Sequence, residues 1–216
     1  MKQMTFLFAL SCMATSVTAQ SDFWNGEKDN GPVTFEVQTG INLSKFANVE
    51  RWNNIKPGLN IGVMAEKPIF YSLSVKAGLF YTMKGAKGKN NGGFGGTIET
   101  TFSPSYLEIP VMASYRYQIT EDLLGQFDFG PYFAYGLHGK NKKVYSGSSV
   151  GKDSETEDDV FEYIKRFDCG VHFGPQVVYK NKYSLSLSYE ISLTDISDMG
   201  DRVGNSNWSI SLGYRF

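Results

Sequence analysis

The 216-residue chain has little cysteine, little histidine and almost no net charge. Its formal net charge is −1, which argues against a nucleic-acid-binding protein, because such proteins usually carry a clear excess of lysine and arginine. The two histidines, His138 and His172, exclude a metal site built from several histidines. The composition therefore gives no reason to expect a cofactor or a nucleic-acid partner.

Long hydrophobic runs are also missing. No stretch after residue 20 approaches the roughly 18 consecutive apolar residues of a membrane-spanning helix, so any crossing of a membrane must use strands. With 41% apolar and 15% aromatic residues, the chain is not expected to be disordered. Its length suits a single domain.

The N-terminus has the pattern of a secretory signal peptide. Lys2 is followed by an apolar stretch at residues 6–10 and by small residues at 17–19, which predicts a signal peptide over 1–19 and one barrel domain over 20–216. A lipoprotein cysteine at Cys12 is the alternative, although the apolar run before it is short. Cys169 is the only cysteine of the mature chain, so no internal disulfide is possible.

Alternation with a period of two dominates the sequence after residue 32. Within 183–194, large apolar side chains alternate with Ser, Glu and Thr, and 207–216 repeats the pattern, so each segment is a strand with one apolar and one polar face. Similar alternation predicts six more strands, at about 33–44, 57–66, 70–83, 105–118, 123–137 and 166–180.

The connections between these eight strands alternate in length. Short joins lie near residues 67–68, 119–122 and 181–182, whereas the joins at 45–56, 84–104, 138–165 and 195–206 are long. Short periplasmic turns, long external loops and an even strand number are typical of membrane barrels. We therefore predict an all-β, eight-stranded antiparallel up-and-down transmembrane barrel with both termini at the periplasmic end.

The polar face combines small residues with sparse charges of both signs, which suits a narrow lumen better than a water-facing surface. Since buried charges are costly unless paired, we expect an interior network that blocks free diffusion. Its members would be Glu36, Lys76, Glu108, Arg116, Asp128, Asp168, His172, Glu190 and Arg215. Aromatic residues near both strand ends indicate two interfacial belts. A soluble barrel with its apolar face inward is the alternative.

Two segments carry a family resemblance. The sequence Tyr-Leu-Glu-Ile-Pro-Val at 106–111, followed by Tyr-Arg-Tyr at 115–117, resembles the outer-membrane β-barrel domain family that includes porin-related and PorT-type small barrels. The final Gly-Tyr-Arg-Phe resembles the terminal strand by which such barrels are recognised for insertion, with Tyr214 and Phe216 as its signal. The resemblance implies an outer-membrane location in a Gram-negative cell and no catalytic residues.

A catalytic site is a minor alternative. His172 and Asp168 share the polar face, and serines are abundant at 184–192, so a hydrolytic triad is conceivable. However, residues four apart on a strand lie about 13 Å apart, too far for a direct hydrogen bond. A hydrogen-bonding role in the lumen is the favoured interpretation, and a lipid-modifying enzyme remains open.

The long connections hold the remaining charged clusters. Five carboxylates between Asp153 and Asp159 could bind a divalent cation, although acidic runs are usually solvated. Lysines could contact lipopolysaccharide phosphates, namely Lys84, Lys87, Lys89, Lys140, Lys142 and Lys143. The glycine-rich run at 92–96 lacks the strand–loop–helix context of a phosphate loop.

The sequence thus favours an integral outer-membrane barrel with a structural or interaction role through its external loops. The expected partners are outer-membrane lipids and lipopolysaccharide, the barrel-insertion machinery and a protein at the external loops. A secretion-accessory or adhesion component, a narrow channel, a lipid-modifying enzyme and a soluble periplasmic ligand-binding barrel are the alternatives.

Overall fold

The computed structural model describes residues 24–47, 54–91, 97–146, 154–197 and 203–216. These residues form ten strands and one short 3-10 helix. In chain order, the elements are β1 (Thr34–Ala47), β2 (Lys56–Phe70), β3 (Leu73–Met83), β4 (Ala86–Asn91), β5 (Thr97–Thr120), β6 (Leu123–Ser146), β7 (Ser154–Asp159), η3 (Val160–Glu162), β8 (Phe167–Tyr179), β9 (Tyr183–Ser192) and β10 (Gly204–Arg215).

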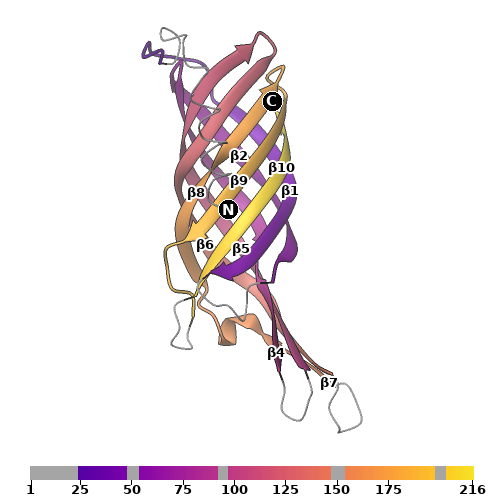
Figure 1. The fold of residues 1–216 in the computed structure, drawn as a ribbon. Coiled ribbons are helices and arrows are strands. Elements are labelled where there is room, and N and C mark those ends of the chain that lie inside the picture. The colour runs from indigo at the N-terminus through magenta and orange to yellow at the C-terminus, as the bar shows by residue number, and fades with distance from the viewer. Residues whose placement is uncertain (1–23, 48–53, 92–96, 147–153, 198–202) are drawn as a thin grey trace, which may run out of the picture.

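Eight of the strands close into a ring of antiparallel neighbours (Figure 1). The order around the ring is β1-β2-β3-β5-β6-β8-β9-β10, and β10 pairs with β1 along its whole length, from Glu36 opposite Arg215 to Ala47 opposite Gly204. The predicted eight-stranded up-and-down barrel is therefore confirmed. Among the described residues, no helix has the length and hydropathy needed to cross a bilayer.

The barrel is apolar outside and polar inside. Along β1, the side chains of Phe35, Val37 and Ile41 are exposed, whereas those of Glu36 and Gln38 between them are buried. The other strands of the ring follow the same rule, with exposed Leu, Ile, Val, Phe and Tyr on the outer wall. A water-soluble barrel has the opposite arrangement, so the alternative of a soluble periplasmic barrel is wrong.

Two of the expected long loops are largely strands. β5 and β6 each run for 24 residues and continue beyond the barrel, where β4 pairs with β5 and β7 pairs with β6. We call this four-stranded extension the blade, and it comprises 86–91, 97–104, 139–146 and 154–159 (Figure 1). The sequence did not reveal it because strands outside the membrane need no alternation of apolar and polar residues.

The opposite end of the barrel has short turns. Between β8 and β9, Lys180 and Asn181 both adopt positive φ angles, of 50° and 52°. This left-handed pair suits a tight hairpin, and the Lys182 amide donates to the Tyr179 carbonyl at 3.0 Å. At the same end, the Asn25 amide donates to the Ser72 hydroxyl at 2.8 Å, which ties the N-terminal segment to the β2–β3 turn.

A closed ring predicts resistance to detergent in the cold, because the strands leave no edge at which unfolding can start. Outer-membrane fractions loaded on a gel without boiling should therefore migrate differently from boiled samples. Identical mobility of the two samples, with the protein recovered in the soluble periplasmic fraction, would contradict the inverted barrel.

Candidate functional site

The periplasmic half of the lumen contains a charged layer, which we call the inner layer. The Arg215 guanidinium donates to Glu36 at 2.9 Å and to Glu66 at 2.7 Å. The Lys76 ammonium lies 2.9 Å from Asp128 and also donates to the amide oxygens of two glutamines, Gln126 and Gln176. The three carboxylates and two cations are nearly free of solvent exposure, so each buried charge has an opposite charge in contact.

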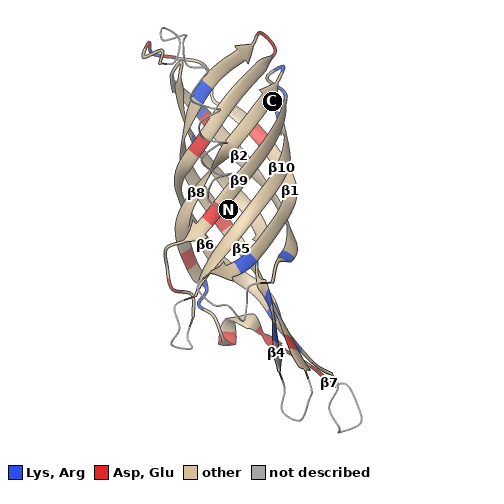
Figure 2. Cartoon of the chain, viewed as in Figure 1, with Lys and Arg blue, Asp and Glu red and all other residues tan. Residues whose placement is uncertain are grey.

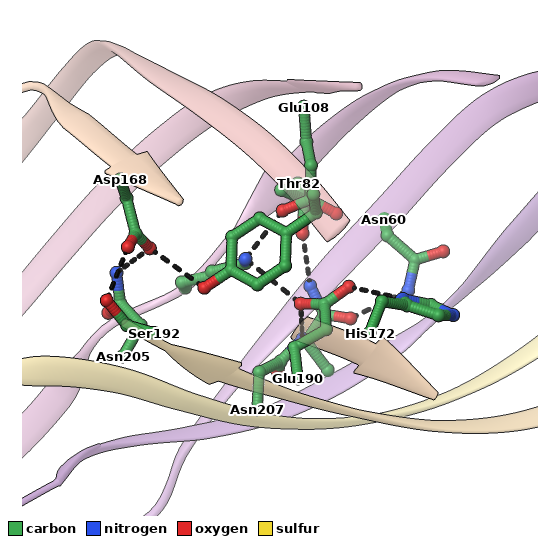
Figure 3. A network of polar contacts seen from close by, with 12 residues as sticks. Asn60, Thr82, Glu108, Asp168, His172, Glu190, Ser192, Asn205 and Asn207 are labelled. Carbon is green, nitrogen blue, oxygen red and sulfur yellow. Dashed lines mark hydrogen bonds and ion pairs between the residues drawn. The ribbon is translucent and has the colours of Figure 1, made fainter. Parts of the chain in front are cut away.

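The extracellular half contains a second cluster, which we call the outer layer (Figure 3). The ammonium of Lys84 lies 2.5 Å from Glu108 and 2.9 Å from Glu190, and 4.3 Å from the centre of the Tyr132 ring. His172 completes the layer, with its Nδ1 atom 3.0 Å from the other oxygen of Glu190. A single lysine therefore holds two buried carboxylates from β5 and β9.

Asp168 forms the outermost part of this layer and is held by neutral groups. Its carboxylate accepts hydrogen bonds from the hydroxyls of Tyr132 and Ser192, at 3.2 and 2.5 Å. Thr194 and Asn205 donate to it as well, at 3.0 and 2.8 Å. Four donors around one fully buried carboxylate replace the water that a charged group needs.

Apolar and amide side chains separate the two layers. Met64, Phe80 and Met112 pack together inside the barrel, and a cavity of about 40 Å³ lies beside them. Asn42 donates to Thr82 at 2.7 Å, and Asn60 donates to Asn42 at 2.7 Å, so this middle zone is also cross-linked. A cavity of this size holds a few water molecules at most.

A hydrophobic cluster, which we call the cap, lies at the base of the blade. It joins residues from β1, β4, β5, the η3 helix, the η3–β8 connection and the β9–β10 connection, namely Phe46, Ala86, Phe102, Val160, Ile164, Ile196 and Val203. Phe161 packs against both the cap and the lumen-facing Tyr106, whose ring it meets edge-on at 6.2 Å. The cap therefore packs directly against the outer part of the lumen.

A family model for the outer membrane protein beta-barrel domain matches residues 18–198. The chain belongs to this family. The protein is located in the cell outer membrane, and its apolar outer wall contacts membrane lipids. The match is to the family as a whole and does not distinguish the PorT-type branch.

Solved structures of small outer-membrane barrels are similar in fold. Ail of Yersinia pestis is 17% identical, with 88% of this chain and 99% of that chain covered and a TM-score of 0.43. Neisserial surface protein A is 15% identical, with 86% and 100% covered and a TM-score of 0.43. OprG of Pseudomonas aeruginosa is 13% identical, with 88% and 98% covered and a TM-score of 0.41. No curated protein matches the chain.

The structure of this family member places the side chains expected in the lumen as follows. Glu36, Lys76, Asp128 and Arg215 lie in the inner layer, and Glu108, Asp168, His172 and Glu190 lie in the outer layer. Arg116 lies at the periplasmic mouth, 3.1 Å from Asp29. The Gly31 amide and this guanidinium hold the pKa of Asp29 below its usual range.

Lys84 was expected in an external loop, in contact with lipopolysaccharide phosphates, and this expectation is wrong. Its side chain is fully buried in the lumen. Lys84 directly follows the end of β3, two residues after the inward-facing Thr82, so extending the alternation by one step would have found it. The same alternation would have added Glu66, which β2 directs inward after Met64.

The residues of the conceivable catalytic triad do not assemble. His172 contacts Glu190, its directly opposite neighbour on β9, whereas Asp168 accepts from Ser192. Both side chains lie within the lumen network rather than at an exposed rim. In the part of the chain that the structure describes, the imidazole contacts a carboxylate and not a serine hydroxyl.

Lysines and carboxylates of two long connections lie on the blade (Figure 2). Their side chains form ion pairs with each other. Lys140 lies 2.5 Å from Glu157, Lys142 lies 2.7 Å from Glu155, and Lys89 lies 3.3 Å from Glu99. Lys143 lies over the ring of Tyr163 at 4.8 Å. Within the described ranges, no group of three His, Cys, Asp or Glu side chains could hold a metal ion. Asp153 and the glycine-rich run at 92–96 lie outside the described residues.

The two residues of the expected insertion signal lie on the outer wall at the periplasmic end. Tyr214 packs against Tyr183 with ring centres 5.7 Å apart, and Phe216 stacks on Phe35 at 6.3 Å. The Phe216 amide donates to the Phe35 carbonyl at 2.9 Å. The terminal residue therefore extends the seam at which the barrel closes.

Removing Lys84 should destabilise the barrel strongly, because Glu108 and Glu190 would lose their shared cation while remaining buried. We expect Lys84→Met to lower the free energy of unfolding by about 3–5 kcal/mol. Lys89→Met removes an exposed blade lysine and should change the free energy of unfolding by less than about 0.5 kcal/mol. Urea titration in lipid vesicles, followed by tryptophan fluorescence, compares the two; equal effects would contradict the assigned role of Lys84.

The two charged layers should also prevent conduction. Reconstituted in a planar bilayer, the wild-type chain should give no discrete current steps, because paired side chains and the Met64 cluster fill the narrow lumen. Reproducible steps from protein that passes the gel-mobility test would show that the layers separate in the membrane.

Proposed function

We propose that the chain is a non-conducting outer-membrane barrel that presents the blade to a protein partner outside the cell. The observation that carries the proposal is the length of β5 and β6. A tilted transmembrane strand needs about 9–11 residues, whereas each of these strands has 24. About half of each strand therefore extends beyond the hydrocarbon core.

The blade has the order expected of a binding surface. β4 pairs in register with β5, starting at Ala86 opposite Phe102 and continuing away from the barrel. β7 pairs in register with β6 in the same way, starting at Asp159 opposite Lys140. The cap fixes its base, and the lysine–carboxylate pairs link neighbouring strands. A surface ordered before binding loses less conformational entropy when a partner docks.

One face of the blade carries charges in stripes along the strands. In register across the sheet, Lys87 of β4, Thr101 of β5, Lys142 of β6 and Glu157 of β7 share this face. The opposite face turns Phe102 and Asn141 toward the cap. The exposed face therefore suits a polar, charged partner surface, and adhesion and secretion-accessory roles are both consistent with it.

The insertion machinery and lipopolysaccharide are the partners proposed for the barrel itself. The terminal aromatics Tyr214 and Phe216 would be presented to the insertion machinery, and residues 1–19 would be removed during export. Lipopolysaccharide contact belongs to the outer wall rather than to the blade lysines, because carboxylates lie within ion-pair distance of Lys89, Lys140 and Lys142. The proposal assigns no reaction to the chain, since the lumen carboxylates and His172 bond to each other.

The test removes the outer part of the blade and leaves the barrel, the cap and the base of the blade. Replacing residues 88–100 and 143–156 each by Asn-Gly joins Lys87 to Thr101 and Lys142 to Glu157, which are directly opposite pairs, through two-residue hairpins. We expect the shortened chain to keep its gel-mobility shift and to lose the protein that mild crosslinking of intact cells captures with the full chain.

A matched control keeps the blade and changes only its exposed charge. Lys140→Glu with Glu157→Lys reverses one ion pair without altering the strand pairing. This variant should still capture the partner if the partner recognises the backbone of the edge strands β4 and β7. It should lose the partner if the partner recognises the charged side chains. Capture of the same protein by the shortened chain would overturn the proposed role of the blade.

A further inference from the structure

The blade ends in two edge strands, β4 on one side and β7 on the other (Figure 1). An edge strand presents backbone N–H and C=O groups with which a further strand can pair. On β4 this position is partly taken, because Lys87 and Asn54 exchange backbone hydrogen bonds of 3.1 and 3.2 Å. Among the described residues, no strand or bridge lies on the far side of β7. β7 is therefore the more open edge of the blade.

The direction of the backbone groups of β7 follows from the bonds that Lys87 makes on β4. In an antiparallel sheet, a residue that bonds to one neighbouring strand does not bond to the other. Lys87 bonds away from β5, so Thr101 opposite it bonds to β6, and Lys142 opposite Thr101 bonds to β5. Glu157, opposite Lys142, therefore directs its N–H and C=O away from β6. Alternation along the strand gives Glu155 the same direction.

The residues whose backbone faces outward also carry acidic side chains. The six residues of β7 include four carboxylates and no lysine or arginine. Glu155 lies 2.7 Å from Lys142, and Glu157 lies 2.5 Å from Lys140. The two glutamate side chains remain 53% and 44% exposed, so each carboxylate is accessible to a second cation. The edge therefore combines outward backbone groups with a negative charge at every second residue.

We propose that β7 binds an extended segment of the extracellular partner, which adds to the blade as a further antiparallel strand. The segment carries Lys or Arg at every second residue, opposite Glu155 and Glu157. Backbone hydrogen bonds supply the affinity in this mode of binding, and alternate side chains supply the specificity. Opposite charges that face each other across two strands stabilise the pairing, whereas a second copy of β7 would bring like charges together. This mode of binding rests on the role proposed for the blade and specifies the chemistry of its partner.

The test uses two peptides of the expected chemistry and the full chain in nanodiscs of phosphatidylcholine. The first peptide is fluorescein-labelled Thr-Lys-Thr-Lys-Thr-Lys-Thr, and the second is the same peptide methylated at its lysine amide nitrogens. Both carry the same charge, but only the first can donate backbone hydrogen bonds to the carbonyls of Glu155 and Glu157. Fluorescence anisotropy should show that the first peptide binds at least about fivefold more tightly, because the second loses two hydrogen bonds.

A matched pair of variants tests the same pairing from the protein side. Glu157→Gln and Glu157→Pro remove the same carboxylate, but only proline removes the outward N–H. Proline is tolerated at an edge position whose N–H faces solvent, so β7 should stay paired with β6. Glu157→Gln should weaken binding of the first peptide about twofold, and Glu157→Pro should weaken it at least about threefold further. If Glu157→Pro loses the gel-mobility shift, Glu155→Pro and Glu155→Gln make the same comparison.

Three results would overturn strand addition at β7. The two peptides could bind equally, which would show attraction between charges alone, or neither could bind at millimolar concentration. Glu157→Pro and Glu157→Gln could also bind the first peptide equally. The blade experiment is read separately, because it measures capture of a cellular protein by the shortened chain. If the shortened chain loses that protein while the first peptide does not bind, the blade keeps its role and the partner uses its charged face instead.

Discussion

The structure depends on the absence of water from the bilayer core. Hydrocarbon offers no hydrogen-bond partner to a peptide group, so each strand must find both neighbours within the chain. The pairing of β1 with β10 meets this requirement by closing the ring. Closure at eight strands gives a narrow lumen, and narrowness brings the charged side chains of opposite walls within bonding distance.

The lumen is therefore a polar core rather than a pore. Arg215 reaches carboxylates from β1 and β2, and Lys84 reaches carboxylates from β5 and β9. Such pairs are worth little in excess of their desolvation cost, but removing one partner leaves a buried charge without compensation. The charges thus set which strand faces meet inside, while the apolar outer wall secures the barrel in lipid.

Outside the membrane, strands need no apolar face toward lipid, and the composition of β5 and β6 changes accordingly. β5 and β6 no longer need apolar residues on one face, so β4 and β7 can flank them with lysines and carboxylates. The cap marks the boundary, since it packs side chains from six parts of the chain over the end of the lumen. Barrel and blade are thus one continuous sheet, of which the barrel lies in lipid and the blade lies in water.

The sequence by itself determined the barrel, its orientation and its family, because alternation such as that of 183–194 follows directly from strand geometry. It also identified most lumen charges, since each lies one step from an apolar neighbour. Only the tertiary structure decided their partners: His172 contacts Glu190 on the next strand rather than Asp168 on its own, because register across strands sets the distances. Only the tertiary structure built the blade, because the pairing of β4 and β7 arises from contacts between segments without a hydrophobic period.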